Sequence, residues 1–154
     1  MITVGIDPDS EKHGVSIYRD DLLDELEQMS LVQIREWIAR QPAPVAQNLY
    51  FSIENVLAQN FVYSRNARSA RAAHAKVALS VGRCQQAQVE LMRELDAQGI
   101  PYELHAPTGH NWANNKAQFE LNTGWEGRSN SDTRSAAFFG WLAIQRRGNH
   151  GSKN

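Results

Sequence analysis

The chain has 154 residues, of which 42% are hydrophobic and 21% are charged, as is typical of a globular domain. No apolar run approaches the roughly 18 residues of a membrane span, and no signal peptide is visible. Cys84 is the single cysteine, which excludes an intrachain disulfide and zinc sites built on several cysteines. The sequence therefore predicts no membrane association and a location in a reducing cytoplasm.

Charge is distributed unevenly, although the formal net charge is only −1. Residues 1–54 contain ten acidic and four basic side chains, a net of −6, whereas residues 55–154 contain seven acidic and twelve basic ones, a net of +5. No acid lies between Asn55 and Val89. This asymmetry predicts a basic face of the kind that binds nucleic acid.

The first half of the chain reads as three strands, a helix and a fourth strand. The strands are expected over residues 2–7, 13–19, about 22–29 and 49–53, although residues 22–27 fit a helix equally well. Ser30 is suited to cap a helix over 31–40, which Pro42 and Pro44 would end.

The second half is richer in helix. The pattern predicts a long helix over 63–97 closed by Gly99, a fifth strand over 101–105, a short helix over 112–121, a loop over 122–131 and a last helix from about 132 to 146. We therefore expect one α/β domain over 1–147, a five-stranded mixed sheet flanked by helices, and a polar, disordered tail over 148–154.

Three acids fall at the ends of predicted elements. Asp7 follows the first strand, Glu54 follows the fourth, and Asp132 opens the last helix. A strand order of 3-2-1-4-5 would place Asp7 beside Glu54, and a helix N-terminus packed nearby would add Asp132. Converging acids repel one another unless divalent cations neutralise them. Two magnesium ions roughly 4 Å apart would activate water and stabilise the leaving oxygen of a phosphodiester.

Each acid also has a simpler explanation. Asp7 precedes Pro8, a common combination in turns. Glu54 can be a surface acid at a strand end, and Asp132 can be a favourable charge at a helix N-terminus. One such acid alone says little, whereas three at these positions point to a metal site.

A basic and aromatic segment follows Glu54. Arg65, Arg68 and Arg71 recur at helical spacing and can contact phosphates on one face. Phe61 and Tyr63 can stack on unpaired bases, or they can be core aromatics beside a solvated helix face. His105 and His110 flank the fifth strand, where they can relay protons or serve a structural role.

Several motifs together resemble a known family. GIDPDSEKHGVSIY, FSIEN, the long Arg/Ala-rich helix and SDTRSAAFFGWLA resemble the RuvC-type Holliday-junction resolvases of the ribonuclease H-like superfamily. The likeness extends over roughly residues 2 to 145. The short length and the TGWEGRSNSDTRSAA segment are more similar to phage-encoded members.

This resemblance implies a ribonuclease H-like fold and a magnesium-dependent endonuclease that cleaves four-way DNA junctions, leaving a 5′-phosphate and a 3′-hydroxyl. It implies that Asp7, Glu54 and Asp132 bind two Mg²⁺ ions, which Mn²⁺ can replace, and that Lys116 lies near the scissile phosphate. It also implies a homodimer in which the long helix forms much of the interface, so that two sites face two strands.

The chain departs from the family at two places. Asp9 stands where the family usually has Gly, and the last helix lacks one of two acids that the family spaces three residues apart. The substituted position is Ser135, or Ser129 if the match slides by one turn. Serine can bind magnesium weakly without contributing charge. Two alternatives therefore stay open: a related nuclease acting on an RNA–DNA hybrid or flap DNA, and a branched-DNA-binding protein that has lost catalysis.

Overall fold

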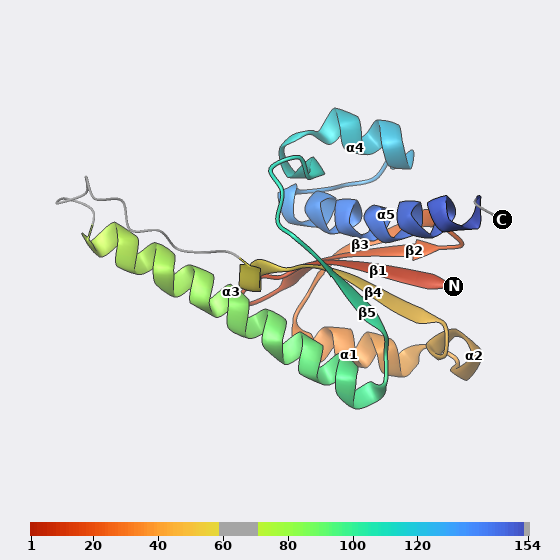
Figure 1. Ribbon diagram of the computed structural model, residues 1–154, viewed down its shortest axis with the longest axis horizontal. Helices are drawn as coiled ribbons and strands as arrows, with labels where there is room; N and C mark the ends of the chain where they lie inside the picture. Colours follow the sequence, from red (N-terminus) through yellow and green to blue (C-terminus); the bar gives the residue numbers. More distant parts are fainter. Residues whose placement is uncertain (59–70, 153–154) are drawn as a thin grey trace.

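The computed structural model describes residues 1–58 and 71–152, and a five-stranded sheet lies at its centre (Figure 1). The strands are β1 (Ile2–Asp7), β2 (His13–Arg19), β3 (Leu22–Met29), β4 (Leu49–Glu54) and β5 (Tyr102–His105). Their order is β3-β2-β1-β4-β5. β2 pairs antiparallel with both β1 and β3, and β4 pairs parallel with both β1 and β5. The predicted order and the five predicted strands are confirmed.

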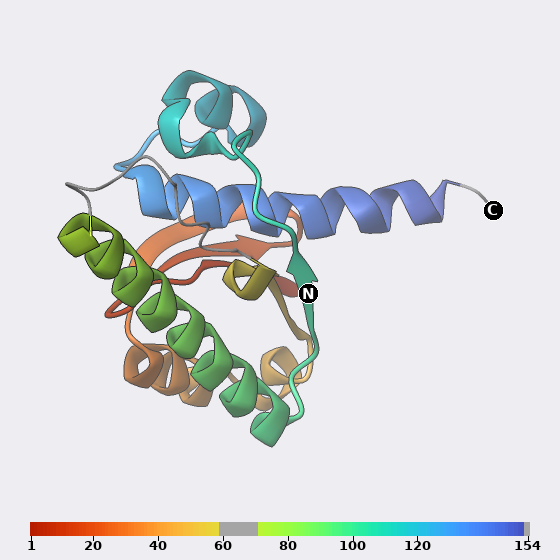
Figure 2. The ribbon, with the colours of Figure 1, turned by 60° about the vertical axis from the view of Figure 1, so that its left-hand side comes forward.

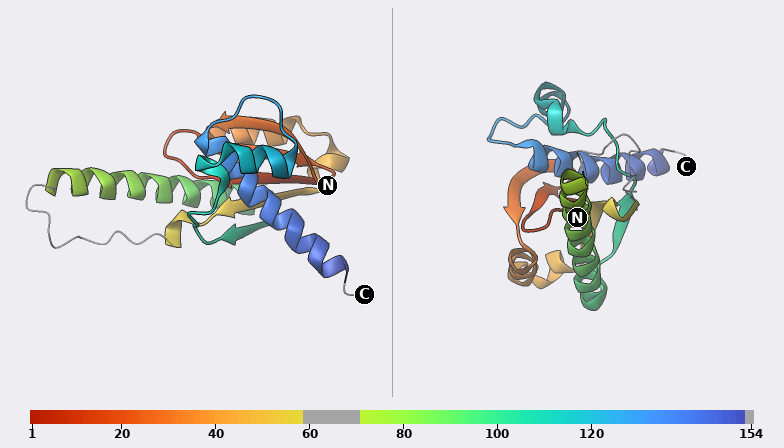
Figure 3. Two further views of the ribbon diagram at one scale, coloured as in Figure 1. Left: turned by 90° about the horizontal axis from the view of Figure 1, so that it is seen from above. Right: turned by 90° about the vertical axis from the view of Figure 1, so that its left-hand side faces the viewer.

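Helices cover both faces of this sheet (Figure 2). They are α1 (Leu31–Arg40), α2 (Ala43–Ala46), α3 (Arg71–Gln98), α4 (Lys116–Thr123) and α5 (Ser131–Gly151), with short 3-10 turns η1 (Val56–Ala58) and η2 (Trp112–Asn114). α5 lies on one face, and α1 and α3 lie on the other. α3 extends well past the edge of the sheet (Figure 3). Within the described ranges, no helix combines the length and apolar character needed to cross a membrane.

The hairpin between β2 and β3 explains why residues 22–29 form a strand rather than a helix. Asp20 and Asp21 both adopt left-handed backbone conformations, with φ of 50° and 65°. Two consecutive residues of this kind form the tight turn whose twist matches an antiparallel hairpin, and aspartate tolerates the conformation better than most residues. β3 is thereby returned along β2.

The two faces of the sheet have different chemistry. One face carries the aliphatic side chains of β1, β2 and β4, which pack with α1 and the C-terminal half of α3 into the main core. Its buried members include Val4, Ile17, Phe51, Trp37 and Leu91. At about 25 cal/mol per Å² of apolar area, this burial is the principal stabilising contribution to the fold.

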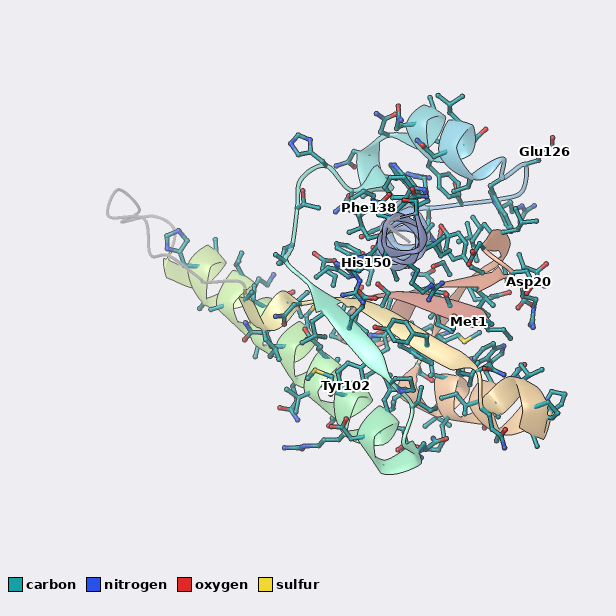
Figure 4. All side chains as sticks on the ribbon, turned by 45° about the vertical axis from the view of Figure 1, so that its right-hand side comes forward. Met1, Asp20, Tyr102, Glu126, Phe138 and His150 are labelled. Carbon is teal, nitrogen blue, oxygen red and sulfur yellow. The ribbon has the colours of Figure 1, made fainter. Side chains whose placement is uncertain are left out.

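The opposite face carries small and polar residues, and α5 lies directly on it. Three hydroxyl groups of the sheet donate to α5 backbone carbonyls: Ser16 Oγ to Ala136 O at 2.9 Å, Tyr18 OH to Ala137 O at 2.6 Å and Ser52 Oγ to Phe139 O at 2.6 Å. A Cβ at Gly5 would lie 2.0 Å from Ala136 O, so only glycine permits this approach. On its other side, α5 carries Phe138, which is labelled in Figure 4. The Phe138 ring meets that of Trp112 in η2 edge to face, with the ring centroids 5.4 Å apart.

Some element boundaries differ from those expected. The predicted start of the long helix, with Phe61, Tyr63, Arg65 and Arg68, lies outside the described residues, and Arg71 is the first residue of α3. The helix predicted over 112–121 is divided into η2 and α4, because Asn115 leaves the helical conformation and caps α4 with its side chain. The short helix α2 was not predicted, because Pro42 and Pro44 were interpreted only as ending α1.

The last helix also extends beyond its predicted end at about residue 146. α5 begins at Ser131, capped by Asn130, and continues to Gly151, where the sequence predicts a disordered segment from residue 148. Gly148 does not adopt the left-handed conformation that ends a helix, in contrast to Gly99 and Gly124, whose φ values are 67° and 69°. Arg147 ties this end of the helix to the sheet through a 2.7 Å hydrogen bond to Thr3 Oγ1.

Candidate metal centre

Two carboxyl groups meet at the C-terminal ends of β1 and β4. These strands are parallel neighbours in which Ile6 pairs with Ile53, so the next residues, Asp7 and Glu54, lie side by side. The Asp7 carboxyl is hydrogen-bonded to the Glu54 carboxyl, and Glu54 is only 8% exposed. The predicted proximity of the two acids is therefore present in the structure.

Their surroundings disfavour two negative charges. Burial, followed by the charge and hydrogen bond of Glu54, raises the pKa of Asp7 to about 8. Burial also raises the pKa of Glu54, which its hydrogen bond with Asp7 partly offsets. Both shifts have the same direction, so this position disfavours two full negative charges. A cation placed between the two carboxyls would relieve that repulsion and favour their ionised forms.

Ser135 is the third group at this position. It lies in the second turn of α5, is only 2% exposed, and its Oγ has no hydrogen-bond partner among the described residues. The hydroxyl nevertheless interacts with the Asp7 carboxyl as a hydrogen-bond donor, which lowers the pKa of Asp7 against the larger effect of burial. A buried hydroxyl without a well-formed hydrogen bond costs free energy, so this group can turn towards a ligand.

Asp132 lies one turn earlier, at the N-terminal end of α5. Its carboxylate accepts a 3.2 Å hydrogen bond from Gln28 Nε2, and burial, followed by the charge of Asp9, raises the pKa of Asp132. Gly14, the register partner of Asp7, permits the approach of this turn, because a Cβ there would lie 2.3 Å from Asp132 O. Asp132 in turn raises the pKa of Asp7, with a smaller effect than that of Glu54.

The alternative match at Ser129 has a different setting. Ser129 precedes the N-cap residue Asn130 and so lies outside α5, where its Oγ accepts a 3.1 Å hydrogen bond from Arg134 Nη1. Its hydroxyl already has a partner. Ser135, by contrast, is buried, unpartnered and beside Asp7, which favours Ser135 as the position of the substituted acid.

The donor set suits a hard divalent cation. Carboxylate and hydroxyl oxygens are the ligands that Mg²⁺ and Mn²⁺ prefer. No Lys, Arg or His in the described part of the chain forms an ion pair with Asp7 or Glu54, so this buried pair fits a bound cation. Among residues 1–58 and 71–152, however, no three His, Cys, Asp or Glu side chains are grouped closely enough to hold a metal ion by themselves. Asp132 is thus the outer member of the predicted set.

Asp9 adds a further negative charge beside this set. Its backbone N–H donates to His13 Nδ1 at 3.2 Å, and its Oδ1 accepts from Ser10 N at 2.6 Å. Burial lowers the pKa of His13 to about 4, so this ring is neutral at pH 7 and can accept. Cys84 Sγ of α3 lies 3.9 Å from Asp9 Oδ1, which joins the acidic turn to the long helix.

Other predicted residues have contacts elsewhere. Lys116 opens α4 with an exposed side chain, which forms a 3.6 Å ion pair with Glu120 of the same helix. His105 is the register partner of Glu54, but its Nε2 lies 2.9 Å from Glu103 Oε2, and burial lowers the pKa of His105. His110 is exposed, and its backbone N–H donates to Thr108 Oγ1.

Two residues around the site were missed from the sequence. Gln28 donates a hydrogen bond to Asp132. Arg134 donates one hydrogen bond of 2.7 Å to Ala113 O and another of 3.1 Å to Ser129 Oγ, and the first of these connects α5 to η2. The sequence offered one indication of a role for Arg134, which is a charged residue within the SDTRSAAFFGWLA segment. It offered no indication for Gln28, because polar residues are common at strand ends.

The strand order, together with α5 on one face and α1 and α3 on the other, defines a ribonuclease H-like fold. Solved structures of RuvC share it. The chain is similar to Thermus thermophilus RuvC in complex with Holliday junction substrate, with a TM-score of 0.58, 16% identity, and coverage of 97% of this chain and 96% of that one. A second Thermus thermophilus RuvC structure has a TM-score of 0.51 and 15% identity, with 97% of both chains covered. No family model and no curated protein sequence matches the chain.

Proposed function

We propose that this protein is a divalent-metal-dependent endonuclease that cleaves branched DNA, with the four-way junction as its substrate. The observation that carries this proposal is the buried Asp7–Glu54 pair beside the buried hydroxyl of Ser135, because two adjacent buried carboxyls and a hydroxyl are oxygen ligands that a divalent cation would stabilise. The substrate class is supported by the likeness to a RuvC structure that was solved with a Holliday junction.

Asp7 and Glu54 would hold Mg²⁺, with Ser135 contributing its hydroxyl or fixing a metal-bound water, and Asp132 would contribute to a second ion. When bound, the metal activates water and stabilises the leaving oxygen of the phosphodiester. β1 and β4 fix the two inner carboxylates on a rigid sheet, and Gln28 orients the outer one. Asp7 must lose its proton for the cation to bind, so metal affinity is expected to rise with pH towards 8.

Three further features belong to the same proposal. A homodimer would present two such sites to the two halves of a junction, whose symmetry is close to two-fold. The basic segment with Phe61, Tyr63, Arg65, Arg68 and Arg71 would contact the junction next to each site. Lys116, which opens α4, would approach the scissile phosphate once DNA is bound.

A nicking assay tests the proposal. A synthetic four-way junction is incubated with the protein and Mg²⁺, Mn²⁺ or EDTA, beside a linear duplex of the same sequence. We expect paired nicks on the junction with either metal and none in EDTA. Asp7→Asn should abolish cleavage and leave junction binding intact or improved, because a negative charge that faces phosphate is removed. Glu126→Gln, at an exposed position that forms no ion pair within the described part of the chain, is the matched control and should cleave normally. Cleavage retained by Asp7→Asn would remove the metal site from the proposal.

A second candidate function is branched-DNA binding without cleavage. Two observations favour it: serine occupies position 135, and no three acidic side chains are grouped closely among the described residues. Tight, junction-selective binding without cleavage in either metal would support this second function. Cleavage of an RNA–DNA hybrid or a flap in preference to the junction would instead indicate a related nuclease with another substrate.

A further inference from the structure

The pairing of β4 within the sheet ends at Glu54, one of the two inner carboxylates of the candidate metal centre. On one side, the ladder between β1 and β4 stops at Ile6 and Ile53, one residue before Glu54. On the other side, the ladder between β4 and β5 stops at Glu54 itself, which pairs with His105. The chain then leaves the sheet and enters η1. The position of Glu54 therefore also depends on what fixes the residues that follow it.

Two glutamine side chains of α3 contact those residues. Gln88 Nε2 donates to Asn55 Oδ1 at 3.0 Å, and Gln88 Oε1 accepts from Leu57 N at 3.3 Å. Between these two contacts along the chain, Gln85 Nε2 donates to Val56 O at 3.1 Å. Each of the three residues that follow β4 is thus hydrogen-bonded to α3.

Asn55, the direct neighbour of Glu54, is fixed from two directions. Its backbone N–H donates to His105 O of β5 at 2.7 Å. Its side-chain oxygen accepts from Gln88, which belongs to α3. The backbone of Asn55 is therefore tied to the edge of the sheet, and its side chain is tied to the helix that packs below that edge.

The amide of Gln88 is unexpected at its position in the helix. Gln88 is 0% exposed, and so are Leu91 and Leu95, which follow at i+3 and i+7 on the same helix face and belong to the main core. An apolar side chain at position 88 would pack in this core without burying an amide, and a buried amide costs free energy unless it is hydrogen-bonded. The groups that Gln88 binds, rather than apolar packing, therefore account for its amide.

We infer that Gln88 is a positioning residue for Glu54, because it fixes the turn after β4 and thereby keeps the Glu54 carboxylate beside that of Asp7. Two ionised carboxylates repel each other, and the pairing of β4 with β1 no longer restrains Glu54 against that repulsion. Gln88 acts through Asn55 and Leu57 and does not bind the cation itself. The inference rests on the proposed function and adds to it a buried residue of α3.

A role in packing alone is the competing explanation. Gln88→Met distinguishes the two, because methionine is close to glutamine in length and volume but lacks both hydrogen-bonding groups of the amide. If Gln88 only fills space, this change affects stability but leaves the metal affinity of the folded protein unchanged. If Gln88 positions Glu54, the same change weakens metal binding in the folded protein.

The test measures binding of Mn²⁺ alone, well below Tm, by the loss of the electron paramagnetic resonance signal of the free ion. Gln88→Met and Asn55→Ala should each weaken Mn²⁺ binding by about tenfold, as expected when a group that orients a metal ligand is lost. The double variant should bind no more weakly than the weaker single variant, because both changes remove the same contact. Amide hydrogen exchange at Leu57 should become faster in Gln88→Met, since this N–H loses its acceptor.

Leu95→Val is the matched control. Leu95 is buried to the same degree in the same helix, seven residues further along. The smaller side chain should lower Tm and leave both the Mn²⁺ affinity and the exchange at Leu57 unchanged. Circular dichroism at the temperature of the titration checks that each variant is folded.

Each outcome decides between the possibilities. An Mn²⁺ affinity in Gln88→Met equal to that of the unchanged protein would overturn this inference, and so would an equal weakening in Leu95→Val. In both cases the proposed metal centre would stand, because the unchanged protein binds the ion. Failure of the unchanged protein to bind Mn²⁺ would remove the proposed metal centre and this inference together. Should Gln88→Met not fold, undiminished binding by Asn55→Ala would overturn the inference from the other side of the contact.

Discussion

The side-chain amide of Gln28 donates to the carboxylate of Asp132 across 3.2 Å, which joins the end of β3 to the first turn of α5. The same amide accepts from Asn130 Nδ2 at 3.3 Å, and Asn130 caps that helix. The orientation of this outer carboxylate therefore depends on an amide held at both its nitrogen and its oxygen.

Gln28→Ala should weaken the metal centre more than the fold. One exposed hydrogen bond contributes about 1 kcal/mol or less to stability, whereas loss of a group that orients a metal ligand lowers metal affinity about 10–100-fold. The measurement is the rise in Tm on titration with Mg²⁺, together with the Mg²⁺ needed for half-maximal cleavage. Gln98→Ala is the control, because Gln98 donates to Glu94 at 2.7 Å far from the site. Equal Mg²⁺ midpoints in the two variants would contradict a positioning role.

The pH dependence of stability should report the Asp7–Glu54 pair. The pKa of Asp7 is raised from 3.8 to about 8, so the folded state binds a proton that the unfolded state releases. Its contribution to stability is complete below pH 4 and is lost as the pH rises towards 8. Without metal, Tm should therefore fall over this range, and Asp7→Asn should flatten the fall. Glu126→Gln should leave the profile unchanged. A metal-free Tm that does not respond to Asp7→Asn between pH 4 and 8 would mean that the two carboxyls do not share a proton.

Ser135→Asp should strengthen metal binding and destabilise the metal-free protein. A third carboxylate beside Asp7 and Glu54 repels both, so Tm in EDTA should fall. Because opposite charges about 4 Å apart attract strongly in a partly buried site, the Mg²⁺ midpoint should fall by about tenfold or more.

Ser135→Ala is the control for this change, and it should alter stability by less than about 1 kcal/mol, because the hydroxyl it removes has no partner. If Ser135→Asp leaves the Mg²⁺ midpoint where it was, Ser135 does not face the metal. The match to the family would then slide by one turn to Ser129.

Gly14→Ala should displace the first turn of α5. The added Cβ would lie 2.3 Å from Asp132 O, which is backbone and cannot turn aside. Overpacking of this kind costs about 1–3 kcal/mol, and the Mg²⁺-induced rise in Tm should shrink because Asp132 moves. Gly109→Ala is the control, since no atom lies within 4 Å of the Cβ it would add. Normal stability in Gly14→Ala would show that α5 can retreat from β2 freely.

The sheet and the inner pair of acids were predictable because they depend on local patterns. Apolar runs bounded by turns located the strands, and a parallel neighbour for β1 was enough to bring Asp7 to Glu54. Ser135 was singled out because the resemblance implies an acid there or, if the match slides by one turn, at Ser129, and this assignment stays a prediction.

What could not be predicted depends on contacts between distant segments. Gln28 meets Asp132 only because β3 ends beside α5, 104 residues later in the chain. Near the end of α5, Arg147 donates a hydrogen bond to Thr3 of β1, and neither residue indicates this contact alone.

Three hydrogen bonds, donated by hydroxyl groups of β2 and β4 to backbone carbonyls of α5, limit how the site can adapt to a ligand. A shift of the helix by one residue would break the hydrogen bonds of Ser16, Tyr18 and Ser52 together. It would also move the Ala136 carbonyl away from its close contact with Gly5. Asp132 and Ser135 therefore keep a fixed height above the strands. If a cation binds here as proposed, its accommodation would have to come from rotation of side chains, and a cation whose radius requires wider spacing would be disfavoured by the backbone.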